Sequence, residues 1–180
     1  MPALRNTVVA VCFLVVPGLA GAQQAASTHP VADALHDAFK EAQDNLVAAV
    51  QAFPADKFGY KPTPAQMSVG EIGLHLASGN TFLCATISGK PRPQWPKMEP
   101  TAPKDSIVAR LKASFDWCGT ALEGVDDSKL GEMVPWFGPQ PVTRATAIVG
   151  LAQDWADHYS QLANYLRLNG LLPPTAGKKE

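Results

Sequence analysis

Three side chains that could bind a metal ion or exchange protons stand beside predicted apolar helix faces: His75, Asp154 and His158. Asp154 and His158 are four residues apart, so they share one face of a helix. Two imidazoles and one carboxylate form a ligand set that suits Zn²⁺, Ni²⁺, Fe²⁺ or Mn²⁺ and leaves coordination positions open. An open position could hold a water molecule for hydrolysis, or a thiolate.

The same side chains also allow a metal-free interpretation. A polar row beside an apolar core must be paired, because burial of unpaired polar groups is costly. Asp154 could accept hydrogen bonds from His75 or His158 in a purely structural network. Gln161 lies three residues after His158 and extends the same helix face. If a metal is bound, we expect Gln161 to orient the site as an outer partner of the ligands.

The elements that must position these side chains are four helices, because apolar residues recur every three or four positions. The predicted helices cover about 30–53, 68–88, 104–122 and 143–169. Ser68 and Glu71 have the spacing of a capping box, and Gly170 suits the position after the last helix. Residues 123–142 are expected to form a loop with a short helical turn near Lys129. No strand pattern competes, so the predicted fold class is all-α.

A long crossover between the second and third helices sets the predicted topology. Residues 90–103 contain five prolines, and such a segment can extend to about 45 Å. A twenty-residue helix is only about 30 Å long, so the chain can return to the level at which the second helix began. The second and third helices then run parallel, and the second and fourth run antiparallel. In that arrangement His75 and His158 differ in height by about 6 Å, against about 12 Å for parallel helices.

Two segments resemble the DinB-like (damage-inducible) family of four-helix bundles. The first runs from Tyr60 to Ser68 and on to His75, and the second runs from His158 through Leu162 to Pro174. The resemblance covers most of the chain after residue 22. It implies an up-down-down-up bundle, in agreement with the crossover argument.

The resemblance also implies a divalent metal held by three histidines, one on the second helix and two on the fourth. His75 and His158 match two of these positions, and Asp154 takes the place of the third histidine. Members of the family include thiol-dependent transferases and isomerases, and others are regarded as metal-dependent hydrolases. The alternative is a non-catalytic bundle that binds a partner or a small molecule.

Residues 1–22 have the three-part pattern of a secretory signal peptide, with a positive start, an apolar run over 8–16 and small residues before the cleavage point. We expect cleavage after Ala22, a bundle over 23–175 and a flexible tail over 176–180. An uncleaved anchor is the alternative, but the apolar run is short for a bilayer span. The pattern predicts a secreted or periplasmic protein.

Cys84 and Cys118 remain after cleavage, in a compartment where disulfides form. Parallel second and third helices would place them at similar heights. Their faces argue against pairing, because Cys84 lies about 180° around the helix from His75 whereas Cys118 lies on the apolar stripe. The sequence therefore allows either a disulfide between Cys84 and Cys118 or two reduced thiols.

Charge and composition limit the partners. The formal net charge is −1, so no basic face is available to neutralise nucleic-acid phosphates. Without a polybasic segment for anionic lipids, we expect no stable membrane association after cleavage. The expected partner is a small-molecule ligand or substrate, and a homodimer is compatible with a bundle. Four apolar side chains could line a pocket or cover the end of the bundle: Phe58, Tyr60, Trp95 and Met98.

Overall fold

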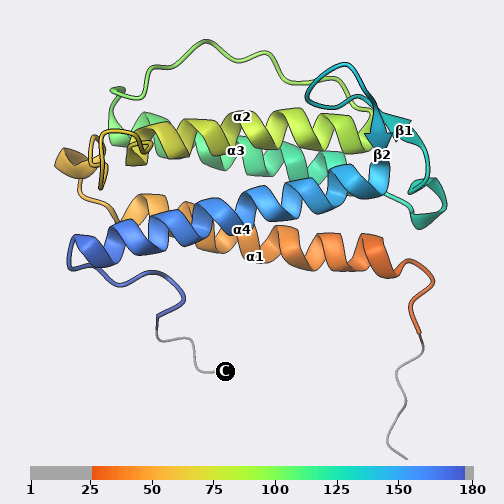
Figure 1. Cartoon of the computed structure of the whole chain (residues 1–180), viewed down its shortest axis with the longest axis horizontal. Helices are drawn as coiled ribbons and strands as arrows, with labels where there is room; N and C mark the ends of the chain where they lie inside the picture. Colours follow the sequence, from red (N-terminus) through yellow and green to blue (C-terminus); the bar gives the residue numbers. More distant parts are fainter. Residues whose placement is uncertain (1–25, 177–180) are drawn as a thin grey trace, which may run out of the picture.

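Four helices form the body of the protein in a computed structural model that describes residues 26–176 (Figure 1). They are α1 Pro30–Ala52, α2 Val69–Ser88, α3 Lys104–Leu122 and α4 Arg144–Leu168. These bounds confirm the all-α fold class. Within residues 26–176, no helix is long and apolar enough to cross a membrane. The signal peptide expected over 1–22 and residues 177–180 of the expected tail lie outside the described residues.

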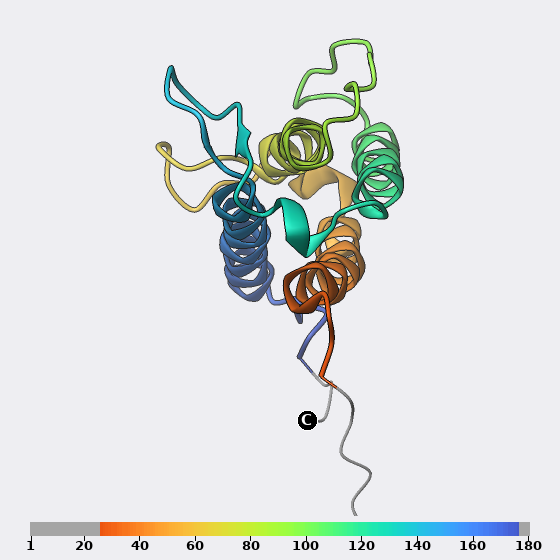
Figure 2. The ribbon, with the colours of Figure 1, turned by 90° about the vertical axis from the view of Figure 1, so that its right-hand side faces the viewer.

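The helices form the predicted up-down-down-up bundle. Residues 89–103 cross back along the outside of the bundle, so α3 begins at the end of the bundle where α2 began (Figure 1). The end-on view shows α2 next to both α3 and α4, with α1 completing the bundle (Figure 2). Therefore α2 is parallel to α3 and antiparallel to α4.

Local capping signals fix where α2 begins and ends. The Ser68 hydroxyl accepts a hydrogen bond from the Glu71 backbone N–H at 3.2 Å, and the Glu71 carboxylate accepts from the Ser68 backbone N–H at 2.6 Å. This pair is the predicted capping box. Gly89 follows α2 with a φ of 74°, a left-handed conformation that glycine adopts without a steric penalty.

The predicted helical turn near Lys129 is a short 3₁₀ helix, η2 Asp127–Lys129. Another short 3₁₀ helix, η1 Ala55–Lys57, lies earlier in the chain, between α1 and α2. The Asp127 carboxylate accepts hydrogen bonds from the backbone N–H groups of Val31 and Ala32, at 2.9 and 2.8 Å. The N–H groups in the first turn of a helix have no acceptor within the helix itself, and a negative charge near them is favourable. The turn therefore closes the N-terminal end of α1.

The expectation of no strand is wrong at one place. Strand β1 Met133–Val134 pairs with β2 Val142–Thr143 in an antiparallel ribbon. Two residues per strand are too few to give an alternating pattern in the sequence, which explains why the ribbon was not predicted. The loop over 135–141 connects the strands and lies beside α2 and α4 (Figures 1 and 2).

A buried polar network joins three helices. Asn80 of α2 is fully buried and accepts a hydrogen bond from the Trp155 indole N–H of α4 at 2.7 Å. Its side-chain amide donates to the Ser114 hydroxyl of α3 at 3.0 Å. Buried polar atoms that are paired in this way fix the relative position of the elements that carry them.

A disulfide joins Cys84 of α2 to Cys118 of α3, with a Cα–Cα distance of 5.4 Å. Both residues are fully buried. The opposite placement of Cys84 and His75 around α2 is no obstacle, because α2 packs on α3 with one side and on α4 with the other (Figure 2).

We expect reduction of this disulfide to lower the free energy of unfolding by about 3 to 4 kcal/mol, since it closes a loop between residues 34 positions apart. Urea unfolding with and without a thiol reductant measures the effect. A variant that carries both Cys84→Ala and Cys118→Ala should give the same curve in both conditions. An unaltered wild-type midpoint after verified reduction would contradict the prediction.

Candidate metal centre

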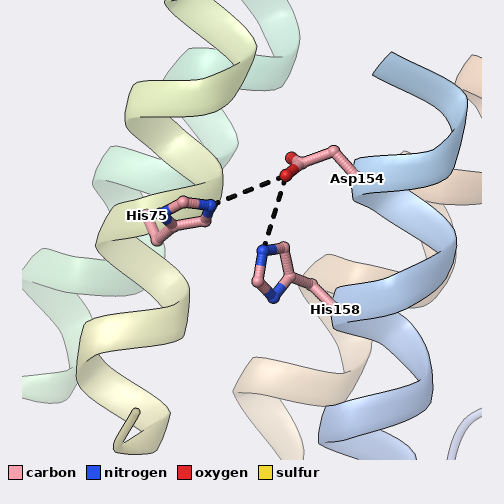
Figure 3. Close-up of side chains that lie close together, drawn as sticks. All are labelled: His75, Asp154 and His158. Carbon is pink, nitrogen blue, oxygen red and sulfur yellow. Dashed lines mark ion pairs between the residues drawn. The ribbon is translucent and has the colours of Figure 1, made fainter. Parts of the chain in front are cut away.

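The antiparallel packing of α2 and α4 brings His75, Asp154 and His158 together, as the sequence predicted (Figure 3). The Nε2 atom of His75 and the Nε2 atom of His158 each lie 3.5 Å from Oδ1 of Asp154. The two imidazole rings meet edge to face, with centroids 4.6 Å apart. One potential ligand atom from each residue lies within 4.8 Å of the other two.

These separations fit a common ion better than they fit direct hydrogen bonds. Ligand atoms about 2.1 Å from an ion at tetrahedral angles are about 3.4 Å from one another. A good hydrogen bond between nitrogen and oxygen is shorter, about 2.9 Å. The spacing between the carboxylate and either imidazole therefore matches the two edges of a metal site.

Burial adds a second observation. The side chain of His158 is only 7% exposed, that of Asp154 is 22% exposed, and that of His75 is 47% exposed. Two buried atoms, Oδ2 of Asp154 and Nδ1 of His158, have no hydrogen-bond partner among the described residues. A buried polar atom without a partner costs about 1 to 3 kcal/mol. Because a carboxylate can bind an ion through one or both oxygens, the donor set fits a divalent cation.

The charges of the three groups are coupled. Burial would raise the pKa of Asp154, but the interactions of its carboxylate with His158 and His75 outweigh this effect and lower the pKa to about 2. Interaction with the Asp154 carboxylate raises the pKa of His75, against the smaller opposing effect of burial. Asp154 is therefore a carboxylate at any physiological pH.

A glycine on α2 leaves room for this carboxylate. A Cβ atom placed on Gly79 would lie 3.1 Å from Oδ2 of Asp154. Gly79 is four residues after His75, so both lie on the side of α2 that faces α4. A larger residue at position 79 would push the carboxylate from its present position.

A pocket of about 330 Å³ opens beside His75 and Asp154. Its walls come from α2, from α4, from the crossover and from the loop between β1 and β2. Beyond the metal set, the larger side chains that line it are aromatic or apolar, with one cation: Phe82, Leu83, Arg92, Trp136 and Phe137. The small residues Ser78, Gly79 and Gly150 complete the lining. A glycine also shapes the wall, because a Cβ atom on Gly150 would lie 2.7 Å from the Trp136 indole.

Sequence reasoning did not find these wall residues. Trp136 and Phe137 lie in a loop, which has no periodicity from which a facing direction can be inferred. Their only signal is a pair of large aromatic residues within a segment rich in proline and glycine. Arg92 lies in the crossover, where the same limit applies.

Other expected site residues lie elsewhere. Gln161 donates a hydrogen bond to Asp157 at 2.8 Å, and the hydrogen bonds of residues 26–176 include none from Gln161 to the metal set. A neighbouring carboxylate one turn away thus takes the amide that was expected to orient the site. The four apolar side chains expected near the bundle end, Phe58, Tyr60, Trp95 and Met98, do not line the pocket beside His75.

Those four side chains have separate roles. Phe58 is buried in the core, and Tyr60 packs edge to face on Tyr165 with ring centroids 5.8 Å apart. The Arg110 guanidinium lies over the Trp95 ring, 5.2 Å from the centroid of that ring. Trp95, Arg110 and Met98 line one hollow. Phe58 also lines a separate pocket at the end of the bundle, so these side chains line hollows away from the metal set as well as covering the bundle.

Comparison with known proteins places the fold. The family model of the DinB superfamily matches residues 38–162. A DinB-like protein from Bacillus subtilis is 16% identical over 76% of this chain and 92% of its own, with a TM-score of 0.60. A conserved protein from Enterococcus faecalis is 16% identical over 77% and 96%, with a TM-score of 0.62. A DinB-like protein from Bacillus cereus is 13% identical over 79% and 95%, with a TM-score of 0.64.

These structural likenesses concern the fold, because the identities are low. No curated protein matches the chain.

The coupled charges predict a pH-dependent contribution to the stability of the metal-free protein. The lowered pKa of Asp154 stabilises the folded state above its ordinary value of 3.8, and this contribution is lost as pH falls toward about 2. The raised pKa of His75 stabilises the folded state below 6.5, and this contribution is lost as pH rises through the raised value. The difference in unfolding free energy between wild type and Asp154→Asn should therefore be most favourable to wild type between pH 3.8 and 6.5.

Urea unfolding across pH, in the presence of a chelator, measures this difference. Asp157→Asn is the matched control, since Asp157 lies on the same helix and pairs with Gln161. A difference between wild type and Asp154→Asn that stays constant from pH 3 to pH 9 would contradict the coupling.

Proposed function

The chain belongs to the DinB superfamily, and we propose that it binds a divalent metal ion through His75, Asp154 and His158 and acts as a metal-dependent hydrolase. The carrying observation is the approach of two Nε2 atoms to one carboxylate oxygen, 3.5 Å from each. Zn²⁺, Ni²⁺, Fe²⁺ and Mn²⁺ all accept two imidazoles and a carboxylate as ligands.

A purely structural network explains the site less well. Such a network should hold hydrogen bonds of ordinary length and leave no buried polar atom without a partner. Here the imidazole-to-carboxylate separations are long for hydrogen bonds, and one atom of Asp154 and one of His158 are buried and unpaired. The long separations and the unpaired Oδ2 atom of Asp154 support a bound cation as the missing partner. Nδ1 of His158 lies on the side of the ring away from Asp154, so its missing partner is a separate matter.

The surroundings of the site support catalysis on a small molecule. A divalent ion held here would supply Lewis acidity to polarise a bond that is to be hydrolysed. His75 and Asp154 line the pocket, so the ligand set is open to a molecule that enters it. Trp136 and Phe137 border the same space and would pack against a bound substrate.

A disulfide and the N-terminal pattern support an exported protein. The bond between Cys84 and Cys118 is typical of an oxidising compartment, and residues 1–22 have the pattern of a signal peptide. Chemistry that depends on reduced cytosolic thiols suits such a compartment poorly, which favours hydrolysis over thiol transfer. N-terminal sequencing of the exported protein should begin at Gln23, whereas an intact Met1 in the mature protein would contradict export by cleavage.

Metal analysis of the purified protein tests the proposal directly. We expect about one equivalent of a divalent transition metal per chain, since one set of three ligands is present among the described residues. His158→Ala should lose the metal, because it removes a buried ligand. Mutation of a residue that hydrogen-bonds to a metal ligand typically lowers metal affinity by about 10- to 100-fold. Loss of a direct ligand should lower the affinity by at least as much.

Two further variants keep the test independent of folding. His36→Ala removes an exposed histidine of α1 and should retain full metal content. Gly79→Ala should weaken metal binding, because the new methyl group presses on Asp154, while helix propensity favours alanine by about 1 kcal/mol. No metal in a folded wild-type protein, or equal metal in wild type and His158→Ala, would overturn the proposal.

A further inference from the structure

The pocket beside the metal set contains an arginine that the proposed metal binding does not use. The Arg92 guanidinium lies 4.2 Å from the centroid of the Phe82 ring, where attraction between the cation and the ring holds it. Arg92 and Phe82 both line the pocket. The crossover thus places one positive charge at the pocket that His75 and Asp154 also border.

Arg92 has no acidic partner within residues 26–176. The ion pairs of the described residues involve other cations, and the carboxylate nearest to the chemistry, Asp154, is already between two imidazoles. A guanidinium offers two parallel N–H groups that match the two oxygens of a carboxylate. This hydrogen-bonding capacity is therefore available to a ligand.

Apart from Arg92, Ser78 and the proposed metal ligands His75 and Asp154, the residues of the wall are aromatic, aliphatic or glycine. Phe82, Trp136 and Phe137 surround part of the space, with Phe82 and Phe137 in ring contact at 4.5 Å and Trp136 and Phe137 at 5.0 Å. Phe137 is 64% exposed, which is high for such a large apolar side chain, and a ligand would cover part of that surface. Aromatic walls with one fixed charge are typical of small-molecule sites.

Pocket size limits what can bind. The volume is about 330 Å³, near the lower end of about 300 to 1,000 Å³ found for ligand sites. This volume suits a small molecule and is too small for several units of a polymer.

We propose that this pocket binds a small organic carboxylate with an aromatic or aliphatic body, whose carboxylate pairs with Arg92 and whose body packs against Phe82, Trp136 and Phe137. The proposal deepens the proposed function, on which it rests for the reaction that follows binding. A cationic ligand is disfavoured, because Arg92 and a metal ion would both repel it and the negative charge of Asp154 would be neutralised by that metal ion.

Three probes of nearly equal shape test the sign of the charge. Calorimetry of the metal-loaded protein should detect binding of phenylacetate, with phenylacetamide about tenfold weaker because it lacks the charge that pairs with Arg92. 2-Phenylethylamine should not bind measurably. An assigned indole N–H resonance of Trp136, identified by its loss in Trp136→Phe, should shift when phenylacetate is added.

Two arginine variants locate the charge that matters. Arg92→Gln should weaken phenylacetate binding about tenfold and leave phenylacetamide binding unaltered. Arg110→Gln is the matched control, since Arg110 also lies over an aromatic ring, that of Trp95, but lines a different hollow. It should bind phenylacetate as wild type does.

The outcomes separate this inference from the metal proposal. Equal binding of phenylacetate and phenylacetamide, no binding of phenylacetate, or equal effects of the two arginine variants would each overturn the inference. Metal content is measured on the same samples, so its absence would overturn the proposed function alone. Phenylacetate binding that requires the metal but is indifferent to Arg92→Gln would overturn the inference and leave the metal proposal intact.

Discussion

A carboxylate between two imidazoles, on the seam between α2 and α4, is the interaction on which the rest of this account depends (Figure 3). Asp154 stays ionised although it is largely buried, and a buried charge is tolerated only beside compensating groups. Those groups come from two helices that are far apart in sequence. The site therefore requires α2 and α4 to run antiparallel at one fixed height, which the crossover over 89–103 makes possible.

Interactions next to the site fix the position of α2 relative to α4 along the bundle axis. Trp155 follows Asp154 directly and donates to Asn80, which follows Gly79, so one buried hydrogen bond joins the two helices beside the carboxylate. On its other side, α2 is joined to α3 by the disulfide at Cys84. These constraints make α2 a fixed support, so a bound ion or ligand would meet side chains that are already in position.

The sequence was informative where spacing determines geometry. Helical periodicity and the capping box located α2, and the crossover argument brought His75 to the level of Asp154 and His158. Spacing alone did not select between the possible partners of a polar side chain on one helix face. Gln161 lies on the expected face of α4, but Asp157 is within reach and takes its amide. The two-residue strands and the loop with Trp136 have no periodic pattern, so the pocket could be recognised only from the structure.

A crystal structure of the purified protein, with anomalous data collected at the absorption edge of the metal found in it, tests the central claim most directly. The account predicts one strong anomalous peak within bonding distance, about 2.0 to 2.2 Å, of an imidazole nitrogen of His75, an imidazole nitrogen of His158 and an oxygen of Asp154. A peak held by other residues, or the three side chains joined only by hydrogen bonds in metal-rich crystals, would contradict it.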